Sequence, residues 1–132
     1  MGGGRPGNDK AKAVVVSQKM ARYSHLPIFQ RGYDLFKIIH HYAAVFPKSE
    51  KYSLGQKLKG ASISFLDQII RANSVRNKRP YLEEASQSLE ILRIYIRLCH
   101  DLKLLSLKRY EITSQKIDEI GRMLGGWLNE NV

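Results

Sequence analysis

Hydrophobic residues recur at steps of three and four along most of this chain, which is the period of an α-helix with one buried face. Four segments show this pattern, at about Pro27 to Phe46, Ser53 to Asn73, Pro80 to Leu104 and Ser114 to Glu130. No stretch alternates with a period of two for long enough to indicate a strand. The pattern therefore predicts an all-α protein with four helices.

Prolines and small polar residues mark the expected helix ends. Pro27 and Pro80 stand where helices begin, since a missing N–H costs little in the first turn. Pro47 is expected to end the first helix. Ser53 and Thr113 are the predicted N-caps of the second and fourth helices. Connections of roughly six to eight residues suit antiparallel neighbours, so the predicted fold is an antiparallel up-down four-helix bundle.

The length of the chain, 132 residues, allows one domain. Residues 1–13 contain three consecutive glycines, a proline and two lysines, and are predicted to form a disordered basic leader. Residues 14–132 are assigned to the bundle. No apolar run approaches the ~20 residues that span a bilayer, and no secretory segment is evident, so no membrane association is expected and the cytoplasm is the default compartment.

The third predicted helix carries two apolar stripes. One consists of Leu82, Ala85, Leu89, Leu92, Ile96 and Cys99. The other consists of Ile91, Ile94, Tyr95, Leu98, Leu102 and Leu105. A helix in a bundle needs about one stripe for its own core, so the second stripe is expected to pack against a neighbouring subunit.

Three glycines interrupt the fourth predicted helix, at Gly121, Gly125 and Gly126. Each costs about 1 kcal/mol relative to alanine in a helix interior. Close approach of another helix is the simplest compensation, and it marks this segment as a packing surface.

Catalytic and metal-binding patterns are missing from the sequence. It contains no Glu-x-x-His pair, Walker loop or dinucleotide turn. The adjacent His40 and His41 would point about 100° apart on a helix, so no metal site and no cofactor are predicted. The single cysteine, Cys99, lies on an apolar stripe and is interpreted as a small buried hydrophobe. A small enzyme that uses Cys99 or a histidine remains an alternative.

Charge is the most informative part of the composition. The chain has 22 Lys and Arg against 12 Asp and Glu, a net charge of +10, which favours a polyanionic partner such as nucleic acid. The candidate binding residues form two clusters, Arg71, Arg76, Lys78 and Arg79, and Arg93, Arg97, Lys103, Lys108 and Arg109. A further cluster comprises Lys48, Lys51, Lys57 and Lys59, and the pattern leaves open whether it binds anything or is only solvated.

Arg93 and Arg97 are four residues apart, so they share one face of the third helix, among large apolar neighbours. Arginines in an apolar and aromatic surround are typical of interfaces with protein or phosphates. The alternative is internal pairing, with Glu90 for Arg93 and Asp101 for Arg97. The sequence does not separate the two.

Two segments resemble a known family. Residues 92–98 read Leu-Arg-Ile-Tyr-Ile-Arg-Leu, and residues 119–128 read Glu-Ile-Gly-Arg-Met-Leu-Gly-Gly-Trp-Leu. These segments are similar to the accessory variability determinant (Avd) proteins of diversity-generating retroelements. The resemblance extends from about Leu26 to Leu128. Small bundles encoded in intervening sequences of 23S ribosomal RNA genes belong to the same fold family.

The resemblance implies a bundle that assembles into a homopentameric barrel and binds the element's reverse transcriptase together with template RNA and cDNA. Such a protein supports mutagenic reverse transcription and has no polymerase site of its own, so it is not an enzyme. It also implies that Arg93 and Arg97 contact transcriptase or RNA, and that Gly121, Gly125 and Trp127 pack helices. The alternative is a general RNA-binding or structural bundle of the ribosomal intervening-sequence type, without a transcriptase partner.

Overall fold

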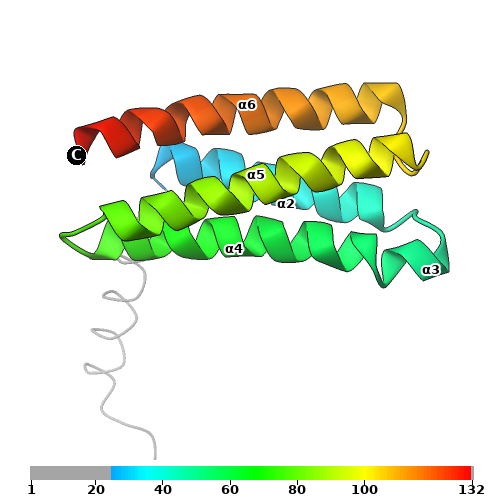
Figure 1. Cartoon of the computed structure of the whole chain (residues 1–132), viewed down its shortest axis with the longest axis horizontal. Helices are drawn as coiled ribbons and strands as arrows, with labels where there is room; N and C mark the ends of the chain where they lie inside the picture. The colour runs from blue at the N-terminus through cyan, green and yellow to red at the C-terminus, as the bar shows by residue number, and fades with distance from the viewer. Residues whose placement is uncertain (1–24, 132) are drawn as a thin grey trace, which may run out of the picture.

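The computed structural model describes residues 25–131, which form four long helices and one short helix (Figure 1). The long helices are α2 (Pro27–Ala43), α4 (Leu54–Ser74), α5 (Arg79–Asp101) and α6 (Leu107–Glu130), and the single-turn α3 (Lys48–Lys51) lies between α2 and α4. The described residues contain no strand. The predicted all-helical four-helix bundle is therefore confirmed. Both the predicted leader at residues 1–13 and the predicted start of the bundle at residues 14–24 lie outside the described residues.

Consecutive long helices run in opposite directions (Figure 1). The main contacts join α2 to α4, α4 to α5, α5 to α6 and α6 to α2, so each helix packs on two neighbours. None of the helices in the described part of the chain is long and apolar enough to cross a membrane.

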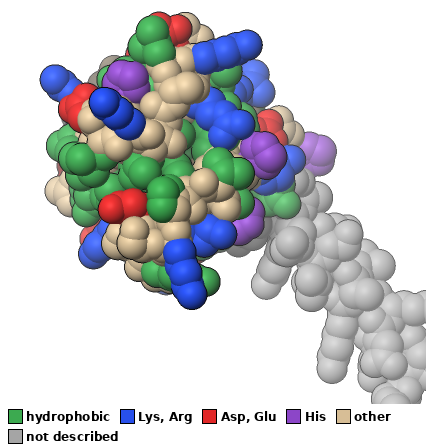
Figure 2. All heavy atoms as spheres, turned by 90° about the vertical axis from the view of Figure 1, so that its right-hand side faces the viewer, with side chains coloured by type: hydrophobic (Ala, Val, Ile, Leu, Met, Phe, Trp, Pro, Cys, Tyr) green, Lys and Arg blue, Asp and Glu red, His purple; other side chains and the backbone are tan. Residues whose placement is uncertain are grey.

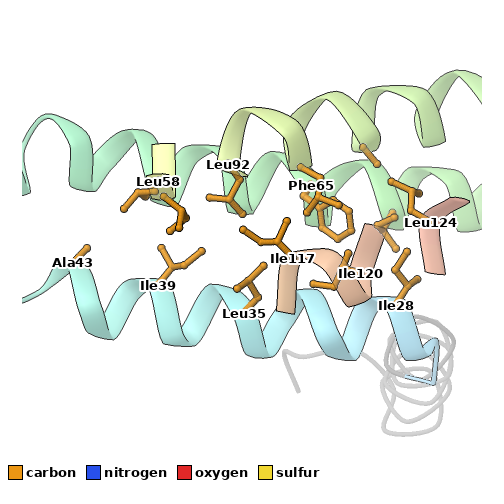
Figure 3. Close-up of a cluster of buried hydrophobic side chains, with 14 of the residues drawn as sticks. Ile28, Leu35, Ile39, Ala43, Leu58, Phe65, Leu92, Ile117, Ile120 and Leu124 are labelled. Carbon is orange, nitrogen blue, oxygen red and sulfur yellow. The ribbon is translucent and has the colours of Figure 1, made fainter. Parts of the chain in front are cut away.

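Each long helix turns one apolar stripe to the centre of the bundle (Figure 3). Leu35 and Ile39 of α2 point toward Ile117 and Ile120 of α6, and Phe65 of α4 completes this layer. All five side chains are almost fully buried. Burial of apolar surface at about 25 cal/mol per Å² is the main force that holds such a bundle together.

The start of the last helix corrects a prediction. Thr113 was expected to cap a helix beginning at Ser114, but α6 begins at Leu107. Ser106 is the N-cap, because its Oγ accepts a hydrogen bond from the N–H of Arg109 at 3.2 Å. Thr113 is buried inside the helix, where its Oγ1 donates to the carbonyl of Arg109 at 2.6 Å. A threonine that bonds four residues back fits a helix interior as well as a cap, which explains the error.

The cap of α4 and the end of α2 also differ from the prediction. Ser53 does precede α4, but its Oγ donates to the carbonyl of Ser49 at 3.1 Å and caps nothing. The first helix ends at Ala43, yet Phe46 beyond it is still buried in the core. A chain that leaves its helix can keep an apolar side chain inward, so the hydrophobic pattern extends past the helix that it predicts.

The α5 C-terminus ends in a Schellman motif. The N–H of Leu104 donates to the carbonyl of Cys99 at 2.8 Å, and the N–H of Lys103 donates to the carbonyl of His100 at 2.9 Å. This geometry places Lys103 in the left-handed region, with φ of 63°. Glycine is the usual residue there because it has no Cβ.

Candidate nucleic-acid interface

The up-down topology brings two separate basic clusters to one end of the bundle. The α2–α4 connection, residues 44–53, and the α5–α6 connection, residues 102–106, lie at the same end, which also holds α3 (Figure 1). We call this the α3 end. The α4–α5 connection, residues 75–78, lies at the opposite end together with the last residues of α6. Lys48 and Lys51 therefore share an end with Lys103 and Lys108.

Charge divides unequally when the long helices are cut at their midpoints. The basic half, residues 36–64 and 91–118, has eleven Lys or Arg and four Asp or Glu. The balanced half, residues 25–35, 65–90 and 119–131, has six Lys or Arg and seven Asp or Glu. The excess positive charge of the described residues thus lies entirely in the half that contains α3.

Most cations of the basic half form no ion pair with any residue that the structure describes. These unpaired cations are Lys48, Lys51, Lys57, Lys59, Lys103, Lys108, Arg109 and Lys116. End-on, Lys and Arg side chains project around the edge of the α3 end, with hydrophobic side chains exposed between them (Figure 2). An unpaired cation at a surface is free to bind a phosphate.

Aromatic rings hold part of this surface in place. The guanidinium of Arg109 lies 4.4 Å from the centre of the Tyr42 ring, a cation–π contact between α6 and α2. The His100 ring stacks on the Tyr110 ring of α6, with 4.7 Å between the ring centres. These contacts order the helix ends that carry the lysines.

Two cations at the α4–α5 connection are bonded within the chain. Lys78 donates from Nζ to the carbonyls of Ala72 at 2.9 Å and Val75 at 2.7 Å. Arg79 pairs with Glu83 at 2.9 Å and also donates to the carbonyl of Leu128 at the end of α6, at 3.3 Å. These two predicted binding residues are therefore bonded within the chain.

Among other arginines of the balanced half, Arg31 is paired within the chain, whereas Arg71 and Arg76 are not. A 2.7 Å ion pair joins Arg31 of α2 to Glu119 of α6, and the hydrogen bond from Arg31 lowers the pKa of Glu119. Arg71 and Arg76 are exposed and form no ion pair with the residues described, so they remain available to a partner.

Arg93 and Arg97 of α5 both lie near the carboxylates that the internal-pairing alternative predicts. Arg93 bonds to Asp118 of α6 and lies 3.3 Å from Glu90, and the Asp118 hydrogen bond raises the pKa of Arg93. Its side chain is 37% exposed. Arg97 is 77% exposed and only 3.9 Å from Asp101. Both arginines thus form the internal pairs of the predicted alternative, and Arg97 is the more exposed of the two.

The second stripe of α5 remains at the surface of the single chain. Ile91, Ile94, Leu98 and Leu102 are exposed, with Ile94 at 64%. Tyr95 is half-buried, and Leu105 belongs to the core instead of the stripe. The first stripe is buried as expected. An apolar helix face of this length is uncommon on a monomer surface and is typical of a protein interface.

The glycines of α6 do not pack as predicted within the chain. A Cβ at Gly125 or Gly126 would meet nothing within 4 Å, and one at Gly121 would make ordinary contacts to Leu89 and Arg93. Gly121 and Gly125 instead line an open groove of about 390 Å³ between α5 and α6. Trp127 packs against the edge of the core, as expected.

The close approach occurs instead at Gly32 of α2. A Cβ there would come within 2.9 Å of the Phe65 ring of α4. Gly32 is buried within a strongly amphipathic helix, and that position is the signal that could have identified it.

Cys99 fits the interpretation as a buried hydrophobe. It is fully buried, and burial, aided by the charge of Glu50, raises its pKa to about 11. The thiol stays protonated at neutral pH, and the thiolate is the nucleophilic form. Among the described residues, no three His, Cys, Asp or Glu side chains are grouped so that they could hold a metal ion.

The sequence leaves the role of four lysines open, and the fold places all of them in the basic half: Lys48, Lys51, Lys57 and Lys59. The predicted topology was enough to show that lysines of the first and third connections lie near one another. In an up-down bundle the first and third connections lie at the same end, so their charges must be counted together.

Comparison with known families agrees with the fold. The sequence model of a family described as bAvd-like matches residues 26–131, nearly the whole described chain. The chain matches no curated protein.

Proposed function

The chain belongs to the bAvd-like family, whose members are retroelement accessory proteins, and on this premise we propose that it serves a diversity-generating retroelement. In this role it binds the element's reverse transcriptase together with template RNA and cDNA, and it supports mutagenic reverse transcription. The protein contributes binding surfaces in the cytoplasm and leaves polymerisation to the transcriptase.

The unpaired cations of the basic half carry the nucleic-acid part of this proposal. Eight cationic side chains lack a carboxylate partner among the described residues. Each could release a counterion on contact with a phosphate, and counterion release supplies most of the affinity in non-specific binding. The exposed Arg71, Arg76 and Arg97 add candidate contacts for the transcriptase.

The exposed stripe of α5 supports the proposal that the protein forms a homo-oligomer, a pentamer by family resemblance. A second copy is the occupant we propose for this face. Its apolar centre and charged edge, with Glu90 and Arg97, have the composition of a subunit interface. Light scattering should show a multimer at micromolar concentration, and the double substitution Ile94→Asp with Leu98→Asp should reduce it. A wild-type monomer at that concentration would contradict this part.

Copurification tests the main proposal. The tagged chain is expressed with the reverse transcriptase of its own element and a template RNA, and the retained protein and RNA are identified. We expect both to be retained, and we expect cDNA made by the complex to carry substitutions at template adenines. Retention of RNA without transcriptase would instead support the ribosomal intervening-sequence type of bundle.

A further inference from the structure

The α3 end combines cations with exposed apolar side chains. Tyr52 is 64% exposed and directly follows Lys51, and Val45 in the same connection is 68% exposed. Leu107, at the start of α6, is 59% exposed. Lysines alone serve any polyanion, whereas an exposed aromatic ring beside them also offers a surface on which an unpaired base can stack.

Lys103 adds an exposed cation to this end at an unusual backbone position. Its left-handed backbone, with φ of 63°, would suit glycine better. The Lys103 side chain is exposed and forms no ion pair with the described residues. A lysine therefore occupies a position where the backbone favours glycine, and its ammonium group stays exposed.

The opposite end shows the contrast. There Lys78 and Arg79 bond to carbonyls and a carboxylate of the chain itself. The balanced half also carries more carboxylates than cations. Among the described residues, this end offers an approaching phosphate backbone fewer unpaired cations and more carboxylates than the α3 end does.

We propose that the α3 end binds single-stranded nucleic acid, with Lys48, Lys51, Lys103 and Lys108 contacting phosphates and Tyr52 stacking on a base. The inference rests on the proposed function and adds to it the face that is used and the strand state that is recognised. A duplex could engage the lysines, but it offers Tyr52 no unpaired base inside the helix.

The first test compares two charge-matched double variants by fluorescence anisotropy with a labelled 20-nucleotide oligouridine. Lys51→Gln with Lys108→Gln removes two charges from the α3 end, and Arg71→Gln with Arg76→Gln removes two from the opposite end. Losing two phosphate contacts should weaken binding about tenfold at physiological salt and lower the salt slope by about 1.4. The control variant should change affinity by less than about twofold. Equal losses in the two variants would overturn the proposal.

The second test concerns stacking. Tyr52→Ala should weaken oligouridine binding by about fivefold or more, since base–aromatic stacking contributes about 1–3 kcal/mol per base. Tyr33→Ala, at an exposed tyrosine of α2, is the control and should leave affinity unchanged. A duplex RNA of the same length should not distinguish Tyr52→Ala from wild type. An equal loss on the duplex would show that Tyr52 stacks on no base.

Crosslinking gives a result that does not depend on variants. Oligouridine containing 4-thiouridine should crosslink to peptides from residues 44–59 and 102–109. Crosslinks confined to residues 71–79 would overturn the proposal, as would an α3-end variant that keeps RNA affinity and loses only transcriptase binding. If the wild-type chain bound no oligouridine at all, the nucleic-acid part of the proposed function would fail as well. The two failures can therefore be told apart.

Discussion

The C-termini of α4 and α5 satisfy their last carbonyl groups in different ways, and the difference decides what the nearby lysine does. At α4 the ammonium group of Lys78 donates to the carbonyls of Ala72 and Val75. At α5 the backbone N–H groups of Lys103 and Leu104 bond back to the helix. When backbone N–H groups bond the last carbonyl groups, the lysine ammonium stays exposed. When the ammonium itself bonds them, it is no longer available to a partner.

The number of basic residues in a connection therefore does not show whether those residues bind a partner. Both connections are rich in lysine and arginine in the sequence. Lys78 and Arg79 are bonded within the fold, whereas Lys103 and Lys108 remain at the surface without an ion pair to the described residues. Stability measurements can separate these two roles, because only the bonds of the first two side chains should affect unfolding.

Lys78→Met should produce the largest effect. It removes two hydrogen bonds from a charged, partly buried donor and leaves the carbonyl groups unpaired, which should cost about 1.5–2 kcal/mol of unfolding free energy. The matched control, Lys108→Met, removes an exposed lysine and should change stability by less than about 0.5 kcal/mol. Urea denaturation measures both. Equal effects would remove the distinction between the two ends.

Arg93→Met should have an intermediate effect, a loss of about 1 kcal/mol, because Arg93 is partly exposed and its bonds to Glu90 and Asp118 are screened by solvent. Arg97→Met should cost only a few tenths of a kcal/mol, as is typical of an exposed pair one turn apart. The same urea series applies. If Arg97→Met were the more destabilising, the internal pairing of Arg93 would not be a stabilising contact.

Lys103→Gly should have a modest effect on unfolding, with the opposite sign. Relief of the left-handed backbone should raise stability by about 0.5–1 kcal/mol. Loss of one phosphate contact should at the same time weaken oligouridine binding by roughly threefold. Lys103→Asn, which also tolerates this backbone, should lose the same affinity with a smaller gain in stability. A stabilised Lys103→Gly that kept full affinity would exclude Lys103 from the binding surface.

The sequence predicts the helices of this protein well because the core needs only one apolar stripe from each. It predicts helix ends less well where polar residues have two possible roles. Thr113 can cap a helix or bond back inside one, and only the packing of the α6 stripe against α2 decides. The short α3 has no buried residue, so the hydrophobic pattern could not predict it.

The candidate surface was partly visible in the sequence. The clusters were evident, but their bonding was not, since the acceptors of Lys78 and the Asp118 partner of Arg93 are set by the tertiary fold. Glycine spacing was misleading for a related reason. Spacing identifies a smooth helix face, as at Gly125, but not whether another helix of the chain covers it, as α4 does at Gly32.

The uneven division of charge has a consequence for how the molecule meets a distant polyanion. The macrodipoles of four alternating helices cancel in pairs, so the side chains alone give the described bundle its electric moment, which points along the long axis toward α3. Within roughly a Debye length, about 8 Å at physiological salt, the field of a nucleic acid exerts a torque on this moment. The torque on the described bundle favours an approach with the α3 end first, and rising ionic strength should abolish that alignment together with its gain in association rate.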